Sequence, residues 1–269
     1  MFHSNSLQPH VNKAESTCLY VLHCFVKVYG LFTLICVYGH AHFKEKCVIL
    51  QPLLHYFIMT HNLLAGKRGI IFGALNEDSI AWKVAVKAVE EGAKITLSNT
   101  PMALRMGQLD ELSKQLDAPV IPADATSVED LEKVFSESVE KLGGKVDFVL
   151  HSIGMSPNVR KHRTYDDLDY NYLQKTLDIS AISFHKMLQV AKKQDAIAEY
   201  GSVVALTYVA SQRTFFGYND MADAKSMLES IARSFGYIYG REKNVRINTI
   251  SQSPTPTTAG KGIKDMENL

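Results

Sequence analysis

The stretch that decides the fold is residues 68–98, RGIIFGALNEDSIAWKVAVKAVEEGAKITLS. It opens with a short apolar run, Arg68–Phe72, and closes with a second one, Lys94–Ser98. Between them, from Ile80 to Glu91, the apolar residues recur at helical spacing, which predicts a helix with one buried face. A strand, a helix and a second strand in this order indicate the start of an α/β domain.

The same alternation continues as far as residue 250. Further apolar runs predict strands at 119–122, 146–151, 201–207 and 245–250, and helical spacing predicts helices at 103–116, 128–142, 171–192 and 219–239. We expect Thr126 to cap helix 128–142, with Glu129 three residues on. Continuous apolar strands between helices predict a Rossmann-like, doubly wound parallel sheet covered on both faces. Ligands of such sheets bind at the carboxyl ends of the strands.

The composition narrows the class of protein. The chain has 269 residues, of which 46% are hydrophobic and 21% charged, with a formal net charge of +1. That apolar fraction supplies a core and excludes extended disorder. The nearly balanced charge disfavours a nucleic-acid partner bound by bulk positive charge. All four cysteines lie before residue 59, so the body of the chain needs no oxidising compartment, which favours the cytoplasm.

The first 58 residues differ from the rest. They hold six of the ten histidines and contain neither Arg nor Asp. The apolar run Cys18–Tyr38 is long enough to cross a bilayer, but Lys27 near its centre opposes insertion. A weak membrane anchor, a packed accessory segment, and upstream sequence read as protein before a true start at Met59 all remain open. The cysteines lack CxxC spacing, so no metal site is expected. We therefore expect an extension, 1–58, and one α/β domain, 59–269.

A phosphate site is suggested at the end of the first strand. Gly73 ends that strand, and Ser79 and Ile80 open the next helix. A tight turn into a helix N-terminus favours an anion, because free N–H groups and the helix dipole both point at it. The fuller G-x-G-x-x-G pattern is absent, and Ser79 also suits a plain helix cap.

Other strand ends offer further candidates for cofactor binding. Asp124 follows the predicted strand 119–122, where it fits either an adenine amino group or a turn cap. Gly154, at the end of His151-Ser152-Ile153-Gly154, either allows a cofactor close to the backbone or is a simple strand-end glycine. The second strand ends at Asn99 with neither an acidic nor a basic residue adjacent. For a site that binds a nicotinamide dinucleotide, this strand end favours NADH and keeps NADPH as the alternative.

Tyr208, Tyr218 and Lys225 form the sharpest catalytic candidate. Tyr208 follows the predicted strand 201–207, and Tyr218 and Lys225 are seven residues apart. That spacing places both on one face of the helix, provided that the helix begins by Tyr218. A neighbouring ammonium stabilises a phenolate, so we expect Lys225 to lower the pKa of Tyr218. Such a pair suits a carbonyl oxygen that gains negative charge during hydride transfer, although Tyr/Lys pairs are also common on helices.

From about Leu63 to Gly262 the chain resembles the bacterial enoyl-acyl-carrier-protein reductases, a divergent branch of the short-chain dehydrogenase/reductase family. The motifs that carry the resemblance are Gly73 with Ser79-Ile80-Ala81, Asp124, His151-Ser152-Ile153-Gly154, Tyr208-x9-Tyr218-x6-Lys225, and Val245-Arg246-Ile247-Asn248 with Pro254. Ordinary family members have Tyr-x3-Lys and a serine thirteen residues before the tyrosine. Ala222 and Ala205 stand at those positions here, which disfavours a generic carbonyl reductase.

The resemblance implies that NADH reduces a trans-2-enoyl thioester on acyl carrier protein, the last step of the fatty acid elongation cycle. It implies that Tyr218 hydrogen-bonds the thioester oxygen as it becomes an enolate, that Lys225 holds the nicotinamide ribose, and that Tyr208 either lines the acyl pocket or assists in catalysis. It further implies cofactor contacts from Gly73, Ser79 and Ile80 at the pyrophosphate, Asp124 and Ala125 at the adenine, Ser152, Ile153, Gly154 and Ile179 along the cofactor, and Pro254 and Thr257 in a covering segment.

Two departures from the resemblance keep other interpretations open. Ser251-Gln252-Ser253-Pro254 stands where many relatives have Ser-Ala-Gly-Pro. Relatives continue beyond the position of Leu269 through a helix and a last strand that completes the sheet and serves a homotetramer interface, so we expect that strand to be missing here. One alternative is a non-catalytic nucleotide-binding relative. Under that hypothesis the chain binds NADH, but an enoyl substrate causes no oxidation of the NADH. A membrane-tethered reductase, supported only by residues 18–38, would be separated from a soluble enzyme by cell fractionation.

Overall fold

The computed structural model describes residues 61–252, 255, 257–258 and 260. The predicted extension 1–58, its boundary with the α/β domain and the candidate Pro254 lie outside the described residues. Within the part of the chain that is described, no helix is both long and apolar enough to cross a bilayer.

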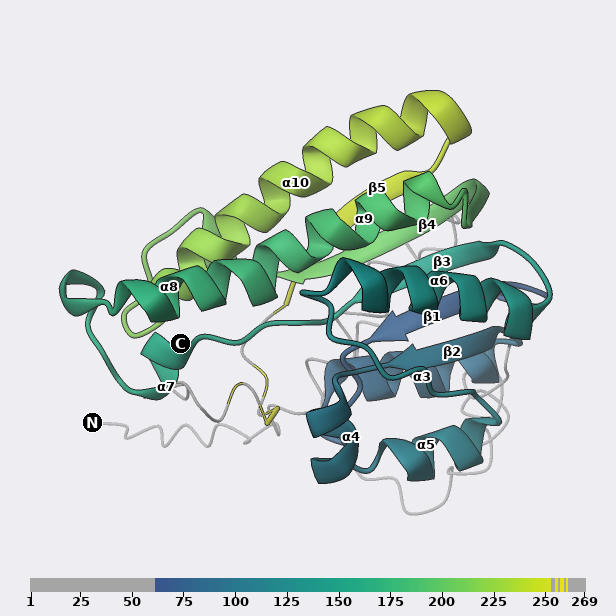
Figure 1. The fold of residues 1–269 in the computed structure, drawn as a ribbon, viewed down its shortest axis with the longest axis horizontal. Coiled ribbons are helices and arrows are strands. Elements are labelled where there is room, and N and C mark those ends of the chain that lie inside the picture. The colour runs from purple at the N-terminus through teal and green to yellow at the C-terminus, as the bar shows by residue number, and fades with distance from the viewer. Residues whose placement is uncertain (1–60, 253–254, 256, 259, 261–269) are drawn as a thin grey trace, which may run out of the picture. The chain divides into compact units, whose positions relative to one another are not determined.

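Five parallel strands form one sheet in the order β2-β1-β3-β4-β5 (Figure 1). Their bounds are β1 Arg68–Phe72, β2 Lys94–Ser98, β3 Val146–His151, β4 Ile197–Thr207 and β5 Arg246–Ser251. The chain steps outward from β1 to β2 and then returns to place β3 on the other side of β1. The direction of winding therefore reverses between β1 and β3, and this reversal point is where doubly wound folds bind their ligands. The predicted doubly wound parallel sheet is confirmed.

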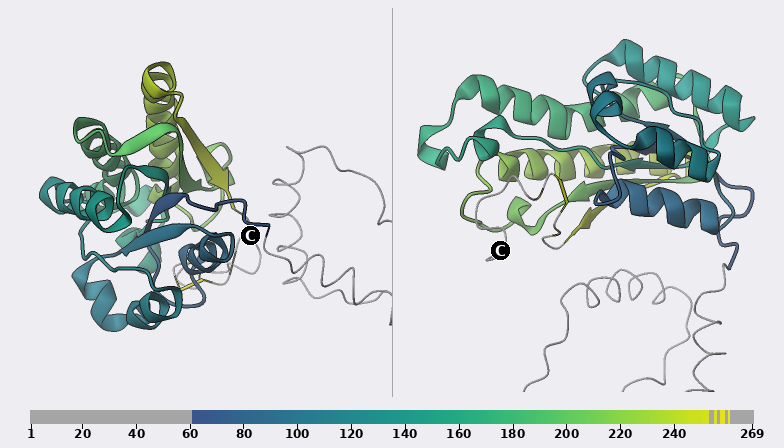
Figure 2. Two further views of the ribbon diagram at one scale, coloured as in Figure 1. Left: turned by 90° about the vertical axis from the view of Figure 1, so that its right-hand side faces the viewer. Right: turned by 90° about the horizontal axis from the view of Figure 1, so that it is seen from below.

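Helices cover both faces of this sheet (Figure 2). One face carries α3 (Ile80–Glu90) and α5 (Leu109–Leu116), and the other carries α6 (Val128–Leu142), α9 (Ser183–Lys193) and α10 (Asp220–Lys243). Successive residues of β1 point to opposite faces of the sheet. Ile70 and Phe72 pack with α6 and α9, and Ile71 packs with α3. This alternation, with both faces covered, explains why the strands read as continuous apolar runs.

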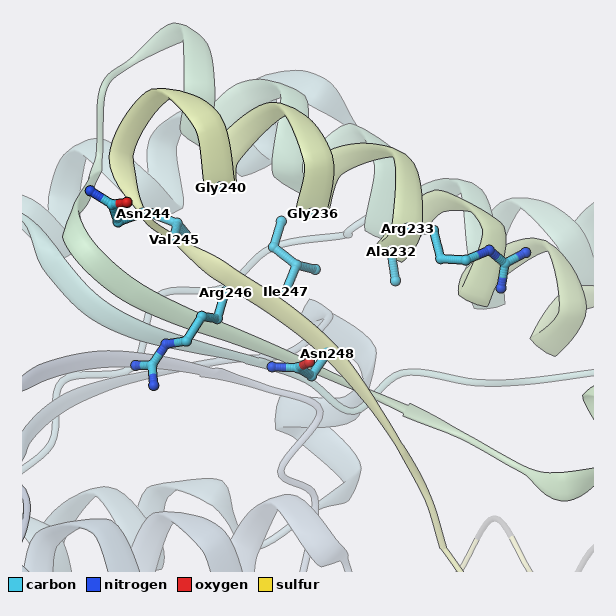
Figure 3. A pocket seen from close by; sticks show the side chains of 9 residues that line it. All are labelled: Ala232, Arg233, Gly236, Gly240, Asn244, Val245, Arg246, Ile247 and Asn248. Carbon is cyan, nitrogen blue, oxygen red and sulfur yellow. The ribbon is translucent and has the colours of Figure 1, made fainter. Parts of the chain in front are cut away.

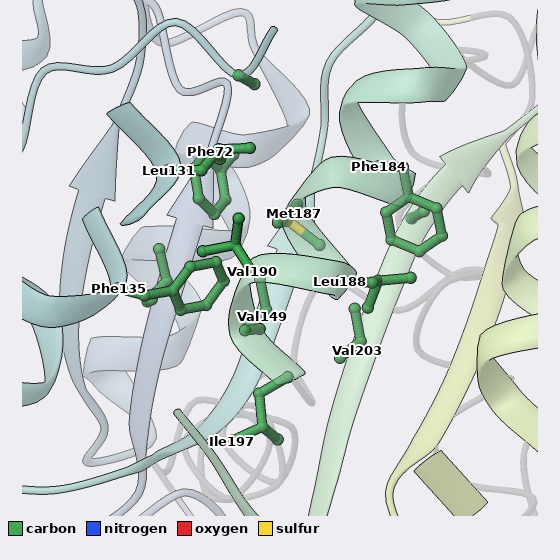
Figure 4. Close-up of a cluster of buried hydrophobic side chains, with 14 of the residues drawn as sticks. Phe72, Leu131, Phe135, Val149, Phe184, Met187, Leu188, Val190, Ile197 and Val203 are labelled. Atoms are coloured by element: carbon green, nitrogen blue, oxygen red, sulfur yellow. The ribbon is translucent and has the colours of Figure 1, made fainter. Parts of the chain in front are cut away.

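The larger core lies between the sheet and helices α6, α9 and α10 (Figure 4). Phe72 from β1 and Phe135 from α6 meet with their ring centroids 6.4 Å apart. Val149 and Val203 from the neighbouring strands β3 and β4, together with Phe184 from α9, are fully buried in the same cluster. Each large apolar side chain buried in this way contributes about 1.5–3 kcal/mol. The core therefore holds β1, β3 and β4 in place beneath the edge where their carboxyl ends meet.

Two predicted elements differ in the structure, and each has a local cause. Residues 119–122 make a single bridge, Leu97 to Val120, instead of a strand, because Pro119 has no N–H to extend the ladder formed by Ile121 N and Leu97 O. The predicted helix 103–116 is two helices, α4 (Pro101–Met106) and α5. They separate at Gly107, where a Cβ would lie 2.6 Å from the carbonyl oxygen of Leu75. The chain bends there to pack against the turn that follows β1.

Two helix details also differ from the prediction. Ser127, not Thr126, caps α6, since the Ser127 Oγ accepts a hydrogen bond from the backbone N of Asp130 at 3.1 Å. The predicted helix 171–192 is α8 (Tyr170–Leu177) followed by α9, joined through a π-helical turn, Asp178–Ile182. Turns of this kind widen a helix and occur often at functional sites. Shorter helical pieces are α7 (Pro157–Arg160) and the 3₁₀ turns Tyr165–Asp167 and Val209–Ser211.

A surface groove runs between the C-terminal half of α10 and β5 (Figure 3). It is lined by Ala232, Arg233, Gly236, Gly240 and residues 244–248. Tyr218 precedes the opposite end of α10, so the groove is not where the candidate catalytic side chains lie. The site must be built instead from the carboxyl ends of the strands.

Candidate active site

At the carboxyl ends of β1 and β3 the two backbones approach closely, with no side chain between them at Gly73. Gly73 follows β1 with φ of +93°, and a Cβ at that position would lie 2.0 Å from the carbonyl oxygen of Ser152. The backbone N of Gly73 donates to Ser98 O at 3.0 Å, and that of Ser152 donates to Phe72 O at 3.3 Å. A side chain at Gly73 is therefore excluded both by its backbone conformation and by its neighbour.

Ser79 organises the turn between Gly73 and α3. Its Oγ accepts hydrogen bonds from the backbone N atoms of Leu75 at 3.2 Å and Trp82 at 3.4 Å. The same hydroxyl donates to Asn76 O at 2.7 Å. Ser79 is thus the cap of α3, one of the two interpretations left open by the sequence. A pyrophosphate contact from Ser79 or Ile80 remains a prediction.

Asp124 and Ala125 lie in the turn before α6. Asp124 is exposed, and its Oδ1 accepts hydrogen bonds from the backbone N of Thr126 at 2.9 Å and from the Thr126 hydroxyl at 2.8 Å. Ala125 is buried. Lys186 on α9 donates to Thr126 O at 2.7 Å and to the carboxylate of Asp178 at 2.8 Å. This lysine ties the predicted adenine turn to the π-helical turn that carries Ile179, while the adenine contact itself stays a prediction.

Four buried polar atoms have no hydrogen-bond partner among the described residues. They are Asn76 Oδ1, Ser98 Oγ, His151 Nδ1 and Gln252 Oε1. Each lies at the end of a strand or in the segment that follows one, at the carboxyl edge of the sheet. Buried polar atoms are almost always satisfied, so such a group marks where a polar ligand is accepted. Together with the bare backbone at Gly73, these atoms suit a hydroxyl-rich dinucleotide such as a nicotinamide cofactor.

The segment after β5 reaches the same edge. Asn76 Nδ2, in the turn after β1, donates to the hydroxyl of Thr258 at 2.9 Å. Thr257 is partly buried, and its hydroxyl accepts a hydrogen bond from the backbone N of Gly260 at 3.0 Å. Thr257 is therefore in a segment joined to the turn after β1, where the sequence predicts a covering segment.

His151 is a buried neutral imidazole at the end of β3. Burial and the nearby charge of Lys225 hold its pKa at about 3. Its Nε2 lies 2.9 Å from the Ser183 hydroxyl, which itself donates to Ile179 O at 2.7 Å. Ser183 therefore accepts from His151 Nε2–H, which leaves Nδ1 as a buried acceptor without a protein partner. The sequence assigns this histidine no role, because within an apolar strand it reads as core.

The rings of Tyr208 and Tyr218 pack together in a tilted arrangement beside the end of β4. Their ring centroids are 4.8 Å apart, and Phe215 packs on Tyr208 at 5.4 Å. Tyr208 is 6% and Tyr218 8% exposed. Burial raises the pKa of both phenols, most strongly that of Tyr218, where Tyr208 adds to the effect. The expectation that Lys225 lowers the pKa of Tyr218 is therefore wrong, and both side chains stay neutral hydrogen-bond donors.

Lys225 lies on α10 and reaches across to the loop after β3. Its Nζ donates to Leu206 O at 2.6 Å, and a Cβ added to Gly154 would lie 3.7 Å from it. Burial lowers the pKa of Lys225 to about 8. Helix α10 begins at Asp220, so Tyr218 lies in the turn before the helix. The prediction that Tyr218 and Lys225 share a helix face is wrong. The turn before the helix still brings Tyr218 against Tyr208, two residues beyond Leu206.

The depressed pKa of Lys225 predicts a pH limit on cofactor affinity. Above pH 8 the ammonium loses its proton, so we expect NADH binding to weaken there and to be constant from pH 6 to 7.5. In Lys225→Met the affinity should be weak throughout, without the alkaline limb. The measurement is NADH fluorescence titration from pH 6 to 10, with Lys193→Met, an exposed lysine of α9, as control.

Folding stability should respond in the opposite direction. The folded pKa of Lys225 lies below its ordinary value of 10.5, so the unfolded chain binds this proton more tightly between about pH 8 and 10.5. The contribution of this group to stability therefore rises with pH in the window where affinity falls. An affinity loss matched by a stability loss, or one that persists in Lys225→Met, would contradict the assignment to Lys225.

The fold and site define a nucleotide-binding α/β domain of the oxidoreductase type. A parallel sheet with a reversal point beside β1, a bare backbone at Gly73 and a tyrosine–lysine set at the same edge are its features. Among the described residues, no three His, Cys, Asp or Glu side chains gather in a way that could hold a metal ion.

Comparison with known proteins identifies the family. The family described as Enoyl-(Acyl carrier protein) reductase matches residues 73–269. The Enoyl-[acyl-carrier-protein] reductase [NADH] 1 of Rhizobium meliloti (strain 1021) is 35% identical over 205 residues, covering 76% of this chain and 73% of the relative. The FabI–NADH complex from Alistipes finegoldii is 70% identical, with a TM-score of 0.76, covering 77% of this chain and 74% of that one. The reductase from Aquifex aeolicus VF5 is 28% identical, with a TM-score of 0.69 and coverages of 77% and 79%.

The chain belongs to the enoyl-(acyl carrier protein) reductase family. The resemblance seen in the sequence, and with it the expected class of NADH-dependent enoyl reductase, is confirmed at the level of the family.

Proposed function

We propose that this chain reduces the carbon–carbon double bond of a trans-2-enoyl thioester carried by acyl carrier protein, with NADH as reductant. The observation that carries the proposal is the packed pair Tyr208–Tyr218 at the carboxyl edge of the sheet, together with the buried Lys225, whose Nζ donates to Leu206 O two residues before Tyr208. Neutral donors at that edge suit an oxygen that gains charge during the reaction.

The cofactor is held by backbone and small residues at three strand ends. Gly73, with the free N–H groups of the first turn of α3, receives the pyrophosphate, and Asp124 and Ala125 receive the adenine. Ser152, Ile153, Gly154 and Ile179 lie along the nicotinamide half, and Pro254 and Thr257 belong to the segment that covers it. When bound, NADH supplies the hydride for the β-carbon of the enoyl group.

Tyr218 donates its phenolic proton in a hydrogen bond to the thioester oxygen. That oxygen becomes an enolate as the β-carbon is reduced, so the hydrogen bond strengthens in the transition state. The raised pKa of Tyr218 fits this role, because a phenol that stays protonated is always available as a donor. The enolate then takes up a proton from water at the α-carbon, which gives the saturated thioester.

Lys225 and Tyr208 support this step from either side. Lys225 offers two further hydrogens beyond the one donated to Leu206 O, which suits the hydroxyls of the nicotinamide ribose. Its positive charge favours the negative charge that develops on the substrate oxygen. Tyr208 forms one wall of the acyl pocket with Phe215 and orients the Tyr218 ring by stacking on it.

We propose the partner, assembly and compartment that the resemblance implies. The carrier of the substrate is acyl carrier protein, the assembly is a homotetramer and the compartment is the cytoplasm, which suits the cysteine-free body of the chain. Light scattering during size-exclusion chromatography measures the molar mass of the assembly and hence the number of subunits.

Loss of NADH absorbance in the presence of an enoyl thioester tests the function. We expect oxidation of NADH that requires both the chain and the 2,3-double bond. The saturated acyl thioester serves as the matched control and should give no oxidation. Saturable NADH binding without enoyl-dependent oxidation would overturn the proposal in favour of a non-catalytic nucleotide-binding protein.

A further inference from the structure

A fully buried carboxylate lies two residues beyond Tyr218. Asp220 is the first residue of α10 and has no solvent exposure. Its Oδ1 accepts a hydrogen bond from the Ser156 hydroxyl at 2.7 Å. Its Oδ2 accepts from Asn158 Nδ2 at 2.9 Å and lies 2.8 Å from the Thr176 hydroxyl. Neither the sequence motifs nor the proposed reaction uses this group.

The partners of Asp220 come from the segments expected to hold the cofactor. Ser156 and Asn158 follow Gly154 in the loop after β3, and Thr176 precedes the π-helical turn of Ile179. Ser156, Asn158 and Thr176 are themselves buried. Asn158 is fixed in turn by hydrogen bonds to both the N and the O of Asp169, at 3.1 and 3.2 Å. One carboxylate therefore joins the start of α10 to both neighbouring walls of the site.

The fold compensates the negative charge of Asp220 locally. A buried carboxylate is costly unless hydrogen bonds satisfy its oxygens. Here three side-chain donors surround it, and its position in the first turn of a 24-residue helix places it in the favourable field of the helix dipole. Removing the carboxylate would leave Ser156 and Asn158 without that acceptor, which is the costly half of breaking a buried hydrogen bond. The Thr176 hydroxyl also lies 2.9 Å from Tyr172 O and keeps that acceptor.

The residue between Tyr218 and Asp220 is strained. Asn219 has φ of 44° and ψ of −131°, a conformation that L-residues rarely adopt. Its side-chain amide donates to the carbonyl oxygen of Arg163. Backbone strain of this kind persists only where the surrounding structure fixes the chain on both sides. Before Asn219, the chain is held by the packing of the Tyr218 ring against Tyr208. After Asn219, it is held by the hydrogen bonds of Asp220.

We propose that Asp220 is the positioning residue for Tyr218. Its hydrogen bonds hold the turn of residues 217–220 in the strained form that directs the Tyr218 phenol at the substrate oxygen. They also keep that turn in register with the loop after β3. The role in catalysis rests on the proposed function, whereas the role in ordering the turn can be tested without any substrate.

Hydrogen exchange on the full chain without cofactor tests the ordering. The backbone N of Met221 donates to Tyr218 O at 3.1 Å, and that of Ala222 donates to Asn219 O at 2.9 Å, so both amides report on the turn. In Asp220→Asn, which keeps the side-chain size, we expect exchange in peptides spanning 214–224 to rise by about tenfold. Unchanged exchange there would overturn the proposal.

Asp223→Asn is the matched control. Asp223 lies on the same helix and is partly exposed; within the described part of the chain the hydroxyl of Tyr165 is its hydrogen-bond donor, at 3.2–3.3 Å. Exchange in the same peptides should stay within about twofold of the native chain, since loss of an exposed surface contact changes little. An increase equal to that of Asp220→Asn would show a general effect of lost negative charge and would overturn the specific role of Asp220.

A double-mutant cycle tests the catalytic consequence. Asp220→Asn should lower kcat by about tenfold and leave KM for NADH within about twofold, as expected for loss of one well-placed hydrogen bond. In a Tyr218→Phe background the same change should cost almost nothing more, because the phenol to be positioned is gone. An equal loss in both backgrounds would show a merely structural role and would overturn the positioning. A native chain without turnover overturns the proposed function instead, and hydrogen exchange then decides the role of Asp220.

Thr176→Val covers the case in which Asp220→Asn does not fold. It removes one donor to the carboxylate and replaces a buried hydroxyl with a methyl group of similar size. We expect smaller changes of the same sign in exchange and in kcat, with the same dependence on Tyr218. No change in either measurement would again overturn the proposal.

Discussion

Phenylalanine in place of Tyr218 is expected to lower kcat for enoyl reduction by about 10- to 100-fold, the usual effect of removing one donor to a developing oxyanion. The phenyl ring that remains still packs against Tyr208, whose ring centroid lies 4.8 Å from that of Tyr218. The pocket therefore keeps its shape and only the hydroxyl is lost. Because this hydrogen bond matters most in the transition state, the Kd for NADH should stay within about twofold. Steady-state kinetics and a fluorescence titration measure the two quantities.

Tyr239→Phe is the matched control for this experiment. Tyr239 is a buried tyrosine on α10, the helix that follows Tyr218, and its hydroxyl donates to Leu188 O at 2.9 Å in the core. Losing that hydroxyl should lower the free energy of unfolding by about 1 kcal/mol and leave kcat unchanged. Native turnover in Tyr218→Phe, together with a loss in Tyr208→Phe, would move the catalytic role to Tyr208.

Strands β1, β2 and β3 were predictable because most of their residues are buried, whereas β5 contains no buried residue. Strands β1, β2 and β3 have the bounds that their apolar runs indicate, and β4 and β5 differ only at their ends. Residues 119–122 looked like a strand for the same reason, but hydropathy carries no information on missing N–H groups. The break at Gly107 depends on a contact with Leu75, which no local pattern reveals.

The site was predictable only where its residues lie close together in the sequence and form a recognisable motif. Tyr218 and Lys225 lie within one stretch of chain, so a motif can find them. The contacts of Asp220 join residues 44 to 64 positions away. The unpartnered Ser98 and His151 become informative only once β2 and β3 are placed on either side of β1 in one sheet. The direction of the Tyr218 pKa shift also depended on burial, which outweighed the expected influence of Lys225.

Gly73 carries the other large expected effect, because two independent constraints coincide there. A Cβ would meet the carbonyl oxygen of Ser152 at 2.0 Å, and that oxygen belongs to a backbone held in the sheet. The φ of +93° disfavours any L side chain in addition. In Gly73→Ala the end of β1 must move away from the loop after β3, which disturbs the proposed cofactor cradle together with the fold.

We therefore expect Gly73→Ala to lower the free energy of unfolding by about 3 kcal/mol or more and to abolish measurable NADH binding. Gly143→Ala is the matched control: its φ is +73°, yet nothing lies within 4 Å of the added Cβ. It should lose only about 1–2 kcal/mol from its backbone conformation and should bind NADH normally. Urea unfolding and NADH titration of both variants separate the contact from the backbone strain. Equal destabilisation, with NADH binding retained in both, would mean that the approach of Gly73 to Ser152 places no constraint on the cofactor site.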